Sequence, residues 1–246
     1  MSALQGKLVF VTGASSGLGA ETARLLSRQG ATVFGIGRDQ ERLAAVFADI
    51  EHGAHAVVDI ATAQAFKDAI ELCVRELGGL DVLINIAGRH QMRRTESMTD
   101  DDWDQDLAVN LNGPFHLCRA ALPYLLERGG NIVNVSSIAG VEGQAYSAGY
   151  CAAKHGLIGL TRALAVEYTA DRLRVNAVCP GGMLTPQIEQ FTAPENPNYD
   201  LIMRTASPRG MMQPADVANV IAFLASDAAA AVHGAVYRVD NGKGAG

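Results

Sequence analysis

The amino-acid sequence predicts an α/β protein with one doubly wound parallel sheet of about seven strands and helices on both faces. Short, almost continuous apolar runs alternate with longer stretches of helical periodicity from the first residues to the last. Apolar runs without polar alternation are what strands need when a parallel sheet is buried on both faces. No linker and no shift in composition divides the chain, so we expect residues 1–246 to form a single domain.

The predicted strands are short and apolar, and β-branched side chains are common in them. They cover residues 8–11, 32–36, 56–58, 81–84, 131–135, 174–178 and 235–239. The predicted helices cover residues 18–29, 40–49, 62–77, 100–128, 147–168 and 214–225. Gly30 ends the first helix, and the Gly113-Pro114 step should kink or divide the fourth, because proline cannot donate a backbone hydrogen bond. Residues 180–208 are rich in proline and lack a period, which predicts a long loop with room for one short helix; its residues 183–207 should contact substrate.

Charge and composition narrow the class of function. Lys and Arg number 20 against 26 Asp and Glu, so the net charge is −6, and 48% of the residues are hydrophobic. This balance excludes a disordered or fibrous chain and argues against binding to nucleic acid or to an anionic membrane. No signal-peptide pattern opens the chain and no apolar stretch is long enough to span a membrane, so we expect a soluble, cytoplasmic protein with small-molecule partners. The cysteines and histidines show no metal-ligand spacing, so no metal is expected.

A glycine-rich turn joins the first predicted strand to the first predicted helix. Residues 12–19 read T-G-A-S-S-G-L-G, with glycines in the spacing G-x-x-x-G-x-G. Glycine at such a place lets the backbone approach a pyrophosphate, and the helix N-terminus supplies oriented N–H groups and partial positive charge. The turn therefore indicates a dinucleotide site, with a tight turn that binds nothing as the alternative.

A second signal comes from Tyr150 and Lys154, which are four residues apart and so share one face of a predicted helix. A lysine ammonium beside a phenol favours the phenolate and lowers the tyrosine pKa, giving a group that exchanges a proton with an alcohol or ketone. A solvated helix face is the alternative for this pair alone. Ser137 lies 13 residues before Tyr150 at the end of a predicted strand, where parallel strands present residues to a ligand crevice.

These residues resemble the short-chain dehydrogenase/reductase family, and the likeness covers essentially the whole chain from Lys7 to about Gly242. Residues 12–19 look like the family's T-G-x-x-x-G-x-G, and residues 85–88 look like its N-N-A-G with Ile86 in place of the second asparagine. Residues 110–115 match N-L-x-G-P-F, and residues 180–185 resemble P-G-x-x-x-T. The resemblance implies a Rossmann-type fold and an NAD(P)-dependent oxidoreductase.

The resemblance also implies roles for individual residues. Tyr150 is the expected general acid/base, Lys154 its activating cation and ribose ligand, and Ser137 the group that holds the substrate oxygen. Asn110 is expected to connect Lys154 to a proton relay. The expected cofactor contacts are Gly13, Ser15, Ser16, Gly17, Leu18, Gly19, Arg38, Asp59, Ile60, Asn85, Ala87, Gly88, Tyr150, Lys154, Pro180, Gly181 and Thr185.

The end of the second strand favours NADP(H) over NAD(H). NAD users of the family commonly place an acidic residue there, and here the position is Gly37 followed by Arg38. The loss of a carboxylate at this position and the gain of a guanidinium make room and charge for a 2′-phosphate. Two observations oppose this: Ser16 occupies a place where many NADP users carry a basic residue, and Asp39 could serve the ribose 2′-OH instead. A solvated Arg38 without a ligand is the remaining alternative.

Three loops should select a carbonyl or alcohol substrate: residues 89–95, 140–147 and 183–207. Among family members the chain most resembles 3-oxoacyl-(acyl-carrier-protein) reductases, with Arg128 and Arg172 where such reductases meet an acidic carrier protein. The alternatives are an NAD-dependent catabolic alcohol dehydrogenase and a catalytically idle nucleotide-sensing regulator. The helix with Tyr150 is apolar around its circumference, so a homotetramer is expected.

Overall fold

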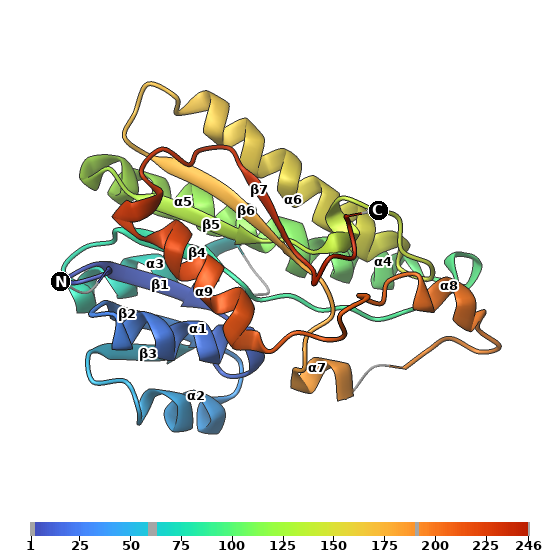
Figure 1. The fold of residues 1–246 in the computed structure, drawn as a ribbon. Helices are drawn as coiled ribbons and strands as arrows, with labels where there is room; N and C mark the ends of the chain where they lie inside the picture. The colour runs from blue at the N-terminus through green and yellow to red at the C-terminus, as the bar shows by residue number, and fades with distance from the viewer. Residues whose placement is uncertain (1–2, 59–62, 190–191, 246) are drawn as a thin grey trace.

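The computed structural model describes residues 3–58, 63–189 and 192–245. Its centre is a seven-stranded sheet in the order β3-β2-β1-β4-β5-β6-β7, with every neighbouring pair parallel (Figure 1). The strands are β1 Leu8–Thr12, β2 Thr32–Gly37, β3 Gly53–Val57, β4 Val82–Asn85, β5 Asn131–Val135, β6 Arg174–Pro180 and β7 Val236–Val239. The strand order reverses between β1 and β4, and such a switch point opens a crevice at the carboxyl ends of the strands.

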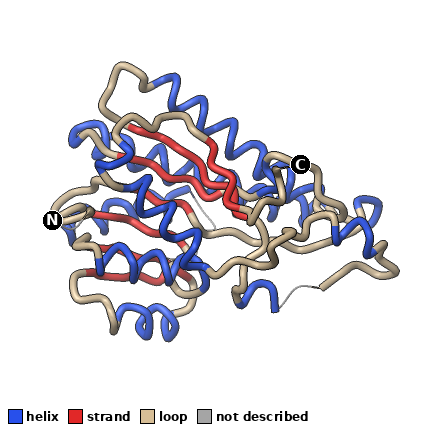
Figure 2. The backbone as a smooth tube through the Cα atoms, viewed as in Figure 1, coloured by secondary structure: helices blue, strands red, loops and turns tan. Residues whose placement is uncertain are grey.

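Helices lie on both sides of the strands, as Figure 2 shows. The helices are α1 Gly17–Arg28, α2 Gln40–Phe47, α3 Ala63–Leu77, α4 Asp100–Leu107, α5 Gly113–Arg128, α6 Ala148–Glu167, α7 Pro186–Glu189, α8 Tyr199–Met203 and α9 Pro214–Ala225. Apolar residues of α1, α2 and α9 share one buried cluster with one face of the sheet, and those of α3, α5 and α6 share a second cluster with the other face. The structure therefore confirms the predicted doubly wound α/β class.

The central strands are apolar because both of their faces are buried. In β1, Val9 and Val11 belong to the cluster under α1 and α9, while Phe10 between them belongs to the cluster on the opposite face. All three side chains are fully buried. Successive residues of a strand point to opposite faces, so a strand covered on both sides has no polar positions to alternate with.

The structure divides the long helix predicted over residues 100–128. A π-helical turn, Ala108–Asn112, separates α4 from α5, immediately before Gly113 and Pro114. Pro114 has no N–H to donate to the carbonyl of Asn110 four residues earlier, so regular α-helix cannot continue through this step. The predicted division of this helix is confirmed, and it begins at Ala108, ahead of the proline.

Two regions differ from the prediction in extent. β3 begins at Gly53, three residues before the predicted start, because the edge strand contains Gly53 and His55 and so lacks an apolar run. The loop after β6 holds two short helices, α7 and α8, where the sequence suggested one. None of the helices in the described residues is long and apolar enough to span a membrane.

Candidate active site

A cavity of about 600 Å³ opens at the carboxyl ends of the parallel strands. Its walls include Thr12 at the end of β1, Gly37 at the end of β2 and Val135 at the end of β5. Most residues predicted to contact a cofactor or substrate line it: Gly13, Ser15, Ser16, Gly17, Leu18, Gly19, Arg38, Ala87, Gly88, Ser137, Tyr150, Lys154, Pro180, Gly181 and Thr185. Asp59 and Ile60 lie outside the described residues.

The glycine-rich turn forms one end of this cavity. Gly13 and Gly17 adopt φ values of +69° and +52°, which glycine reaches without strain. A Cβ on Gly19 would stand 2.1 Å from the carbonyl oxygen of Gly13, so the first turn of α1 packs directly on the end of β1. The N-cap residue of α1, Ser16, makes no side-chain cap hydrogen bond, which leaves the first backbone N–H groups of the helix available to an anion.

Thr12 fixes the distance between the two strands that flank the crevice. Its hydroxyl oxygen accepts hydrogen bonds from the backbone N–H groups of Ile86 and Ala87, both at 2.8 Å. Because the bonds use the backbone, the departure from the family pattern at Ile86 leaves this connection intact. Thr12 belongs to the glycine-rich motif, and its place directly before Gly13 is the sequence signal for this role, which was not predicted.

Asn85 is buried beneath the cavity and does not line it. Its side-chain amide donates to the Asn134 oxygen at 2.8 Å, joining the ends of β4 and β5 inside the sheet. Asn85 thus joins the strands beneath the crevice, whereas the family resemblance implied a contact with the adenosine side of a cofactor. Spacing alone cannot distinguish the two, because the face to which the last strand residue points depends on the pairing register.

Ser137, Tyr150 and Lys154 come together at the other end of the cavity. Ser137 follows β5 and is close enough to Tyr150 to lower the phenol pKa, and its oxygen accepts from the backbone N–H of Ala139 at 3.1 Å. Lys154 lies one turn beyond Tyr150 on α6, with its ammonium 5.7 Å from the centroid of the phenol ring. That ammonium donates to the carbonyl oxygen of Val135 at 3.0 Å.

Burial controls the protonation of this group. It raises the pKa of Tyr150 to about 12, although the hydrogen bond with Ser137 acts in the opposite direction. Burial also lowers the pKa of Lys154 to about 8. The expectation that Lys154 brings the phenol pKa below its usual range is wrong for this arrangement, because the desolvation of the phenol outweighs other influences. At neutral pH the phenol therefore keeps its proton.

Asn110 lies on the π-helical turn behind the cavity and is completely buried. Its side-chain oxygen accepts from the backbone N–H of Arg89 at 3.2 Å, and its amide donates to the carbonyls of Arg89 and Asp106, both at 3.0 Å. A Cβ on Gly88 would stand 3.0 Å from the Asn110 oxygen and 3.4 Å from the Lys154 ammonium. Asn110 therefore holds the backbone that runs past Lys154.

The charged side chains that line the cavity are Arg38, Arg89 and Lys154, and no acidic residue of the described chain lines it. Three cations and the open N-terminus of α1 fit a dinucleotide, which carries negative phosphates along its length. The described residues contain no cluster of His, Cys, Asp and Glu that could hold a metal ion. Met183, in the predicted substrate loop, also lines the cavity, together with four residues that the sequence did not point to: Ile36, Val58, Gln105 and Val109.

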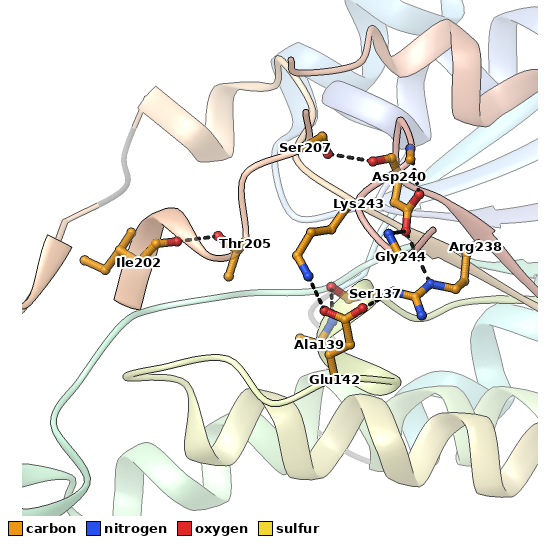
Figure 3. Close-up of polar contacts among 11 residues, drawn as sticks. Ser137, Ala139, Glu142, Ile202, Thr205, Ser207, Arg238, Asp240, Lys243 and Gly244 are labelled. Carbon is orange, nitrogen blue, oxygen red and sulfur yellow. Dashed lines mark hydrogen bonds and ion pairs between the residues drawn. The ribbon is translucent and has the colours of Figure 1, made fainter. Parts of the chain in front are cut away.

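The wall beyond Ser137 is held by a charged cluster that reaches the C-terminal segment (Figure 3). Glu142 accepts from Lys243 at 2.5 Å and from Arg238. The carbonyl oxygen of Asp240 accepts from the hydroxyl of Ser207, at the end of the predicted substrate loop, at 2.6 Å. Three segments far apart in the sequence are thus joined beside the substrate end of the cavity.

Comparisons with known proteins agree with this site. Residues 13–243 match the family model described as enoyl-(acyl carrier protein) reductase. A short-chain dehydrogenase/reductase of Penicillium canescens is 36% identical, with 98% of each chain covered. A 3-oxoacyl-(acyl-carrier-protein) reductase of Thermotoga maritima is 37% identical, with 97% of this chain and 98% of the relative covered. A D-threitol dehydrogenase of Mycolicibacterium smegmatis is 35% identical over 97% of this chain and 93% of its own.

Solved structures give the same result. A dehydrogenase/reductase from Sinorhizobium meliloti has a TM-score of 0.89 and 33% identity, covering 98% of this chain and 96% of that one. Carveol dehydrogenase from Mycobacterium avium, solved in complex with NAD, has a TM-score of 0.88 and 30% identity, covering 99% of both chains.

Proposed function

The chain belongs to the short-chain dehydrogenase/reductase family, and from this premise we propose that it reduces a ketone to a secondary alcohol, reversibly, with NADP(H) and with Tyr150 as the proton donor. It is an oxidoreductase that acts on alcohols or ketones with a nicotinamide dinucleotide. The observation that carries the proposal is the convergence of Ser137, Tyr150 and Lys154 on one cavity whose charged lining residues are cations.

The residues of the site divide the chemistry among them. The nicotinamide, when bound, supplies or accepts the hydride. Ser137 holds the substrate oxygen and the Tyr150 hydroxyl in one hydrogen-bonded group. Because the Tyr150 phenol is protonated at neutral pH, it is ready to donate to the carbonyl oxygen of a ketone. In the oxidative direction the phenolate takes the proton back, and the high phenol pKa leaves little phenolate available for this at neutral pH.

Lys154 and Asn110 support the proton donor. The Lys154 ammonium, held by the Val135 carbonyl, stabilises negative charge on the phenolate after transfer. Asn110 acts through the Arg89 backbone, so it is a positioning residue of the site.

Replacement of Tyr150 by Phe tests this role, because it removes the donated proton and keeps the ring. The variant should keep the affinity for NADPH within about twofold and lose at least about 100-fold in kcat, the lower range of general acid catalysis. A variant that turns over like the wild type would contradict the assignment. Loss of both binding and turnover would instead indicate damage to the fold.

Arg38 supports the preference for NADP(H). The Arg38 side chain is exposed at the end of β2, lines the cavity, and forms no ion pair with a described carboxylate. The competing acceptor, Asp39, is already engaged: it caps α2 by accepting from the Arg42 N–H at 3.0 Å and pairs with the Arg42 guanidinium at 3.1 Å. A side chain on Gly37 would meet the Ser15 hydroxyl at 3.0 Å, so an acidic residue there would be crowded.

Titration of the protein with NADPH and with NADH, followed by nicotinamide fluorescence, measures this preference. NADPH should bind more tightly, and Arg38→Ala should weaken NADPH by tenfold or more while it changes NADH by less than about twofold, as expected for a charge-assisted contact. Equal losses would refute Arg38 as a phosphate ligand. Tighter NADH binding by the wild type would favour a catabolic NAD-dependent dehydrogenase, and binding of neither would favour a regulator without turnover.

The substrate class is a small ketone or secondary alcohol. A 3-oxoacyl thioester on a carrier protein is the second candidate, favoured by the relative from Thermotoga maritima. The predicted carrier contacts give this candidate little support. Arg128 already pairs with Asp81 at 2.7 Å. Arg128 and Arg172 both lie at the amino ends of strands, away from the carboxyl ends where the cavity and Tyr150 lie. Assays with a panel of small ketones and with 3-oxoacyl thioesters, free and carrier-bound, separate the two.

A further inference from the structure

Tyr150 has an aromatic neighbour that the proposed chemistry does not use. The imidazole of His90 stacks on the phenol ring, with centroids 4.3 Å apart and planes inclined at 27°. His90 belongs to the segment after β4, whereas Tyr150 lies in the first turn of α6. Stacked rings at this distance gain a specific interaction beyond the burial of their surfaces. The contact thus connects the proton donor to a second wall of the cavity.

A hydrogen bond fixes the orientation of the imidazole. The Nε2 atom of His90 lies 2.8 Å from the hydroxyl oxygen of Ser147, which is buried just before α6. The Ser147 hydroxyl donates its proton to the carbonyl oxygen of Ala145, at 3.2 Å. When this hydroxyl donates to Ala145, its oxygen accepts from the Nε2–H tautomer of His90.

The segments that hold the two rings are also joined through their backbones. The N–H of Arg93 donates to the carbonyl of Tyr146 at 2.8 Å, and the Arg94 guanidinium lies 5.6 Å from the centroid of the Tyr146 ring. His90 and Ser147 stand in the same pair of segments. The stack therefore lies between two segments that are anchored to each other, and the imidazole cannot turn away from the phenol without losing its contact with Ser147.

The imidazole carries no charge at neutral pH. Burial, with the nearby Lys154 ammonium, lowers the pKa of His90 to about 4. A neutral ring leaves Lys154 as the cation closest to the phenol on α6 and adds no second charge that would alter the acidity of Tyr150. This protonation state suits a packing role and not an exchange of protons near pH 7.

We propose that His90 is a positioning residue for Tyr150: its plane, anchored by Ser147, holds the phenol ring so that the hydroxyl stays at Ser137. The inference rests on the proposed function, since a fixed phenol matters only if it donates a proton. Catalytic groups need to be held within about 0.5 Å of the productive geometry by the packing of their own rotamers. The stack supplies that restraint on one side of the ring.

Two substitutions separate the plane of His90 from its chemistry. His90→Phe keeps a flat ring and loses the hydrogen bond, whereas His90→Leu keeps bulk and loses the plane. We expect His90→Phe to retain kcat within about threefold and His90→Leu to lose on the order of tenfold to 100-fold, with KM for the ketone and Kd for NADPH unchanged. His116→Leu is the matched control, because His116 stacks on Phe66 elsewhere in the protein and should keep wild-type kcat.

Either of two results would overturn the inference: a His90→Leu variant with wild-type kcat, or a His90→Phe variant as slow as His90→Leu. The second result would mean that the imidazole nitrogens are required, in the reaction or in the contact with Ser147, and that a flat ring alone does not position the phenol. Equal losses of kcat and nucleotide affinity in His90→Leu would also count against it, because general damage to the site produces that pattern.

A readout without turnover keeps the inference separate from the proposed function. The ring carbons of Tyr150, ¹³C-labelled and assigned by comparison with Tyr150→Phe, feel the ring current of the stacked imidazole. Their resonances should move in His90→Leu and stay close to wild type in His116→Leu. If the wild type reduces no carbonyl compound while these shifts appear, the proposed function fails and the stack stands. Unmoved resonances in His90→Leu would refute the stack itself.

Discussion

Replacing Thr12 by Val tests the connection between β1 and β4 at the floor of the crevice. Valine keeps the shape of threonine and removes the oxygen that accepts from the N–H groups of Ile86 and Ala87. Thr12 is 2% exposed, so its hydroxyl cannot be replaced freely by water. Two backbone donors left without a partner cost about 1–3 kcal/mol each when buried, and because both residues are only half-buried we expect a total loss of about 2–4 kcal/mol.

Equilibrium unfolding in urea, at one fixed protein concentration, measures this loss, and a melting curve should show a Tm lower by roughly 4–16 °C. Thr12→Ser is the matched control, since serine keeps the accepting oxygen. NADPH affinity should fall in Thr12→Val, because a Cβ on Gly13 would stand 3.2 Å from the Cα of Ala87 and the glycine turn therefore moves with the end of β4. A loss below about 1 kcal/mol in Thr12→Val, or an equal loss in Thr12→Ser, would refute the reasoning.

Other expected outcomes follow from the same structure. Gly19→Ala should weaken NADPH on the order of 100-fold in a fluorescence titration, because its Cβ would stand 2.1 Å from the Gly13 oxygen, while Gly143→Ala, with nothing within 4 Å, should bind normally. NADPH affinity should fall as the pH rises through about 8, where Lys154 loses its charge, and Lys154→Met should remove that dependence. Glu142→Gln should lower the free energy of unfolding by about 1 kcal/mol, a small loss because the ion-pair partners are partly exposed. Lys243 and Arg238 hold the pKa of Glu142 below its usual value, so in the wild type this contribution is present above pH 4.5 and is lost as the pH falls further. The variant should show no such pH dependence. Light scattering should give a homotetramer, and a monomer at micromolar concentration would contradict the expected association through α6.

The central strands could be predicted because burial on both faces gives each one a continuous apolar run, which can be recognised without knowing its neighbouring strands. β5 shows it: Ile132 faces one cluster, Val133 faces the other, and both are fully buried. The edge strand β3 leaves no such signature, since Gly53 and Val57 are exposed and His55 is only half-buried. Its course is set by pairing with β2, a tertiary interaction that periodicity within one segment cannot report.

The catalytic trio could also be predicted, because its spacing is local. Tyr150 and Lys154 share a helix face whatever the rest of the fold does, and Ser137 ends a strand whose carboxyl end must point to the crevice. The direction of the Tyr150 pKa could not be predicted from that spacing. It depends on how much solvent the surrounding segments remove, and Lys154 is desolvated by the same environment that desolvates the phenol.

Asn110 shows how a break in a helix becomes part of a site. Pro114 cannot donate the α-helical hydrogen bond to the Asn110 carbonyl, and the backbone before it forms a π-helical turn over Ala108–Asn112. From that turn the Asn110 side chain reaches both backbone groups of Arg89, in the segment that runs from Gly88 beside the Lys154 ammonium to His90 on the Tyr150 ring. Pro114 and Asn110 therefore act together. The proline causes the irregular turn, and the turn carries the asparagine side chain that holds this segment against the proton donor.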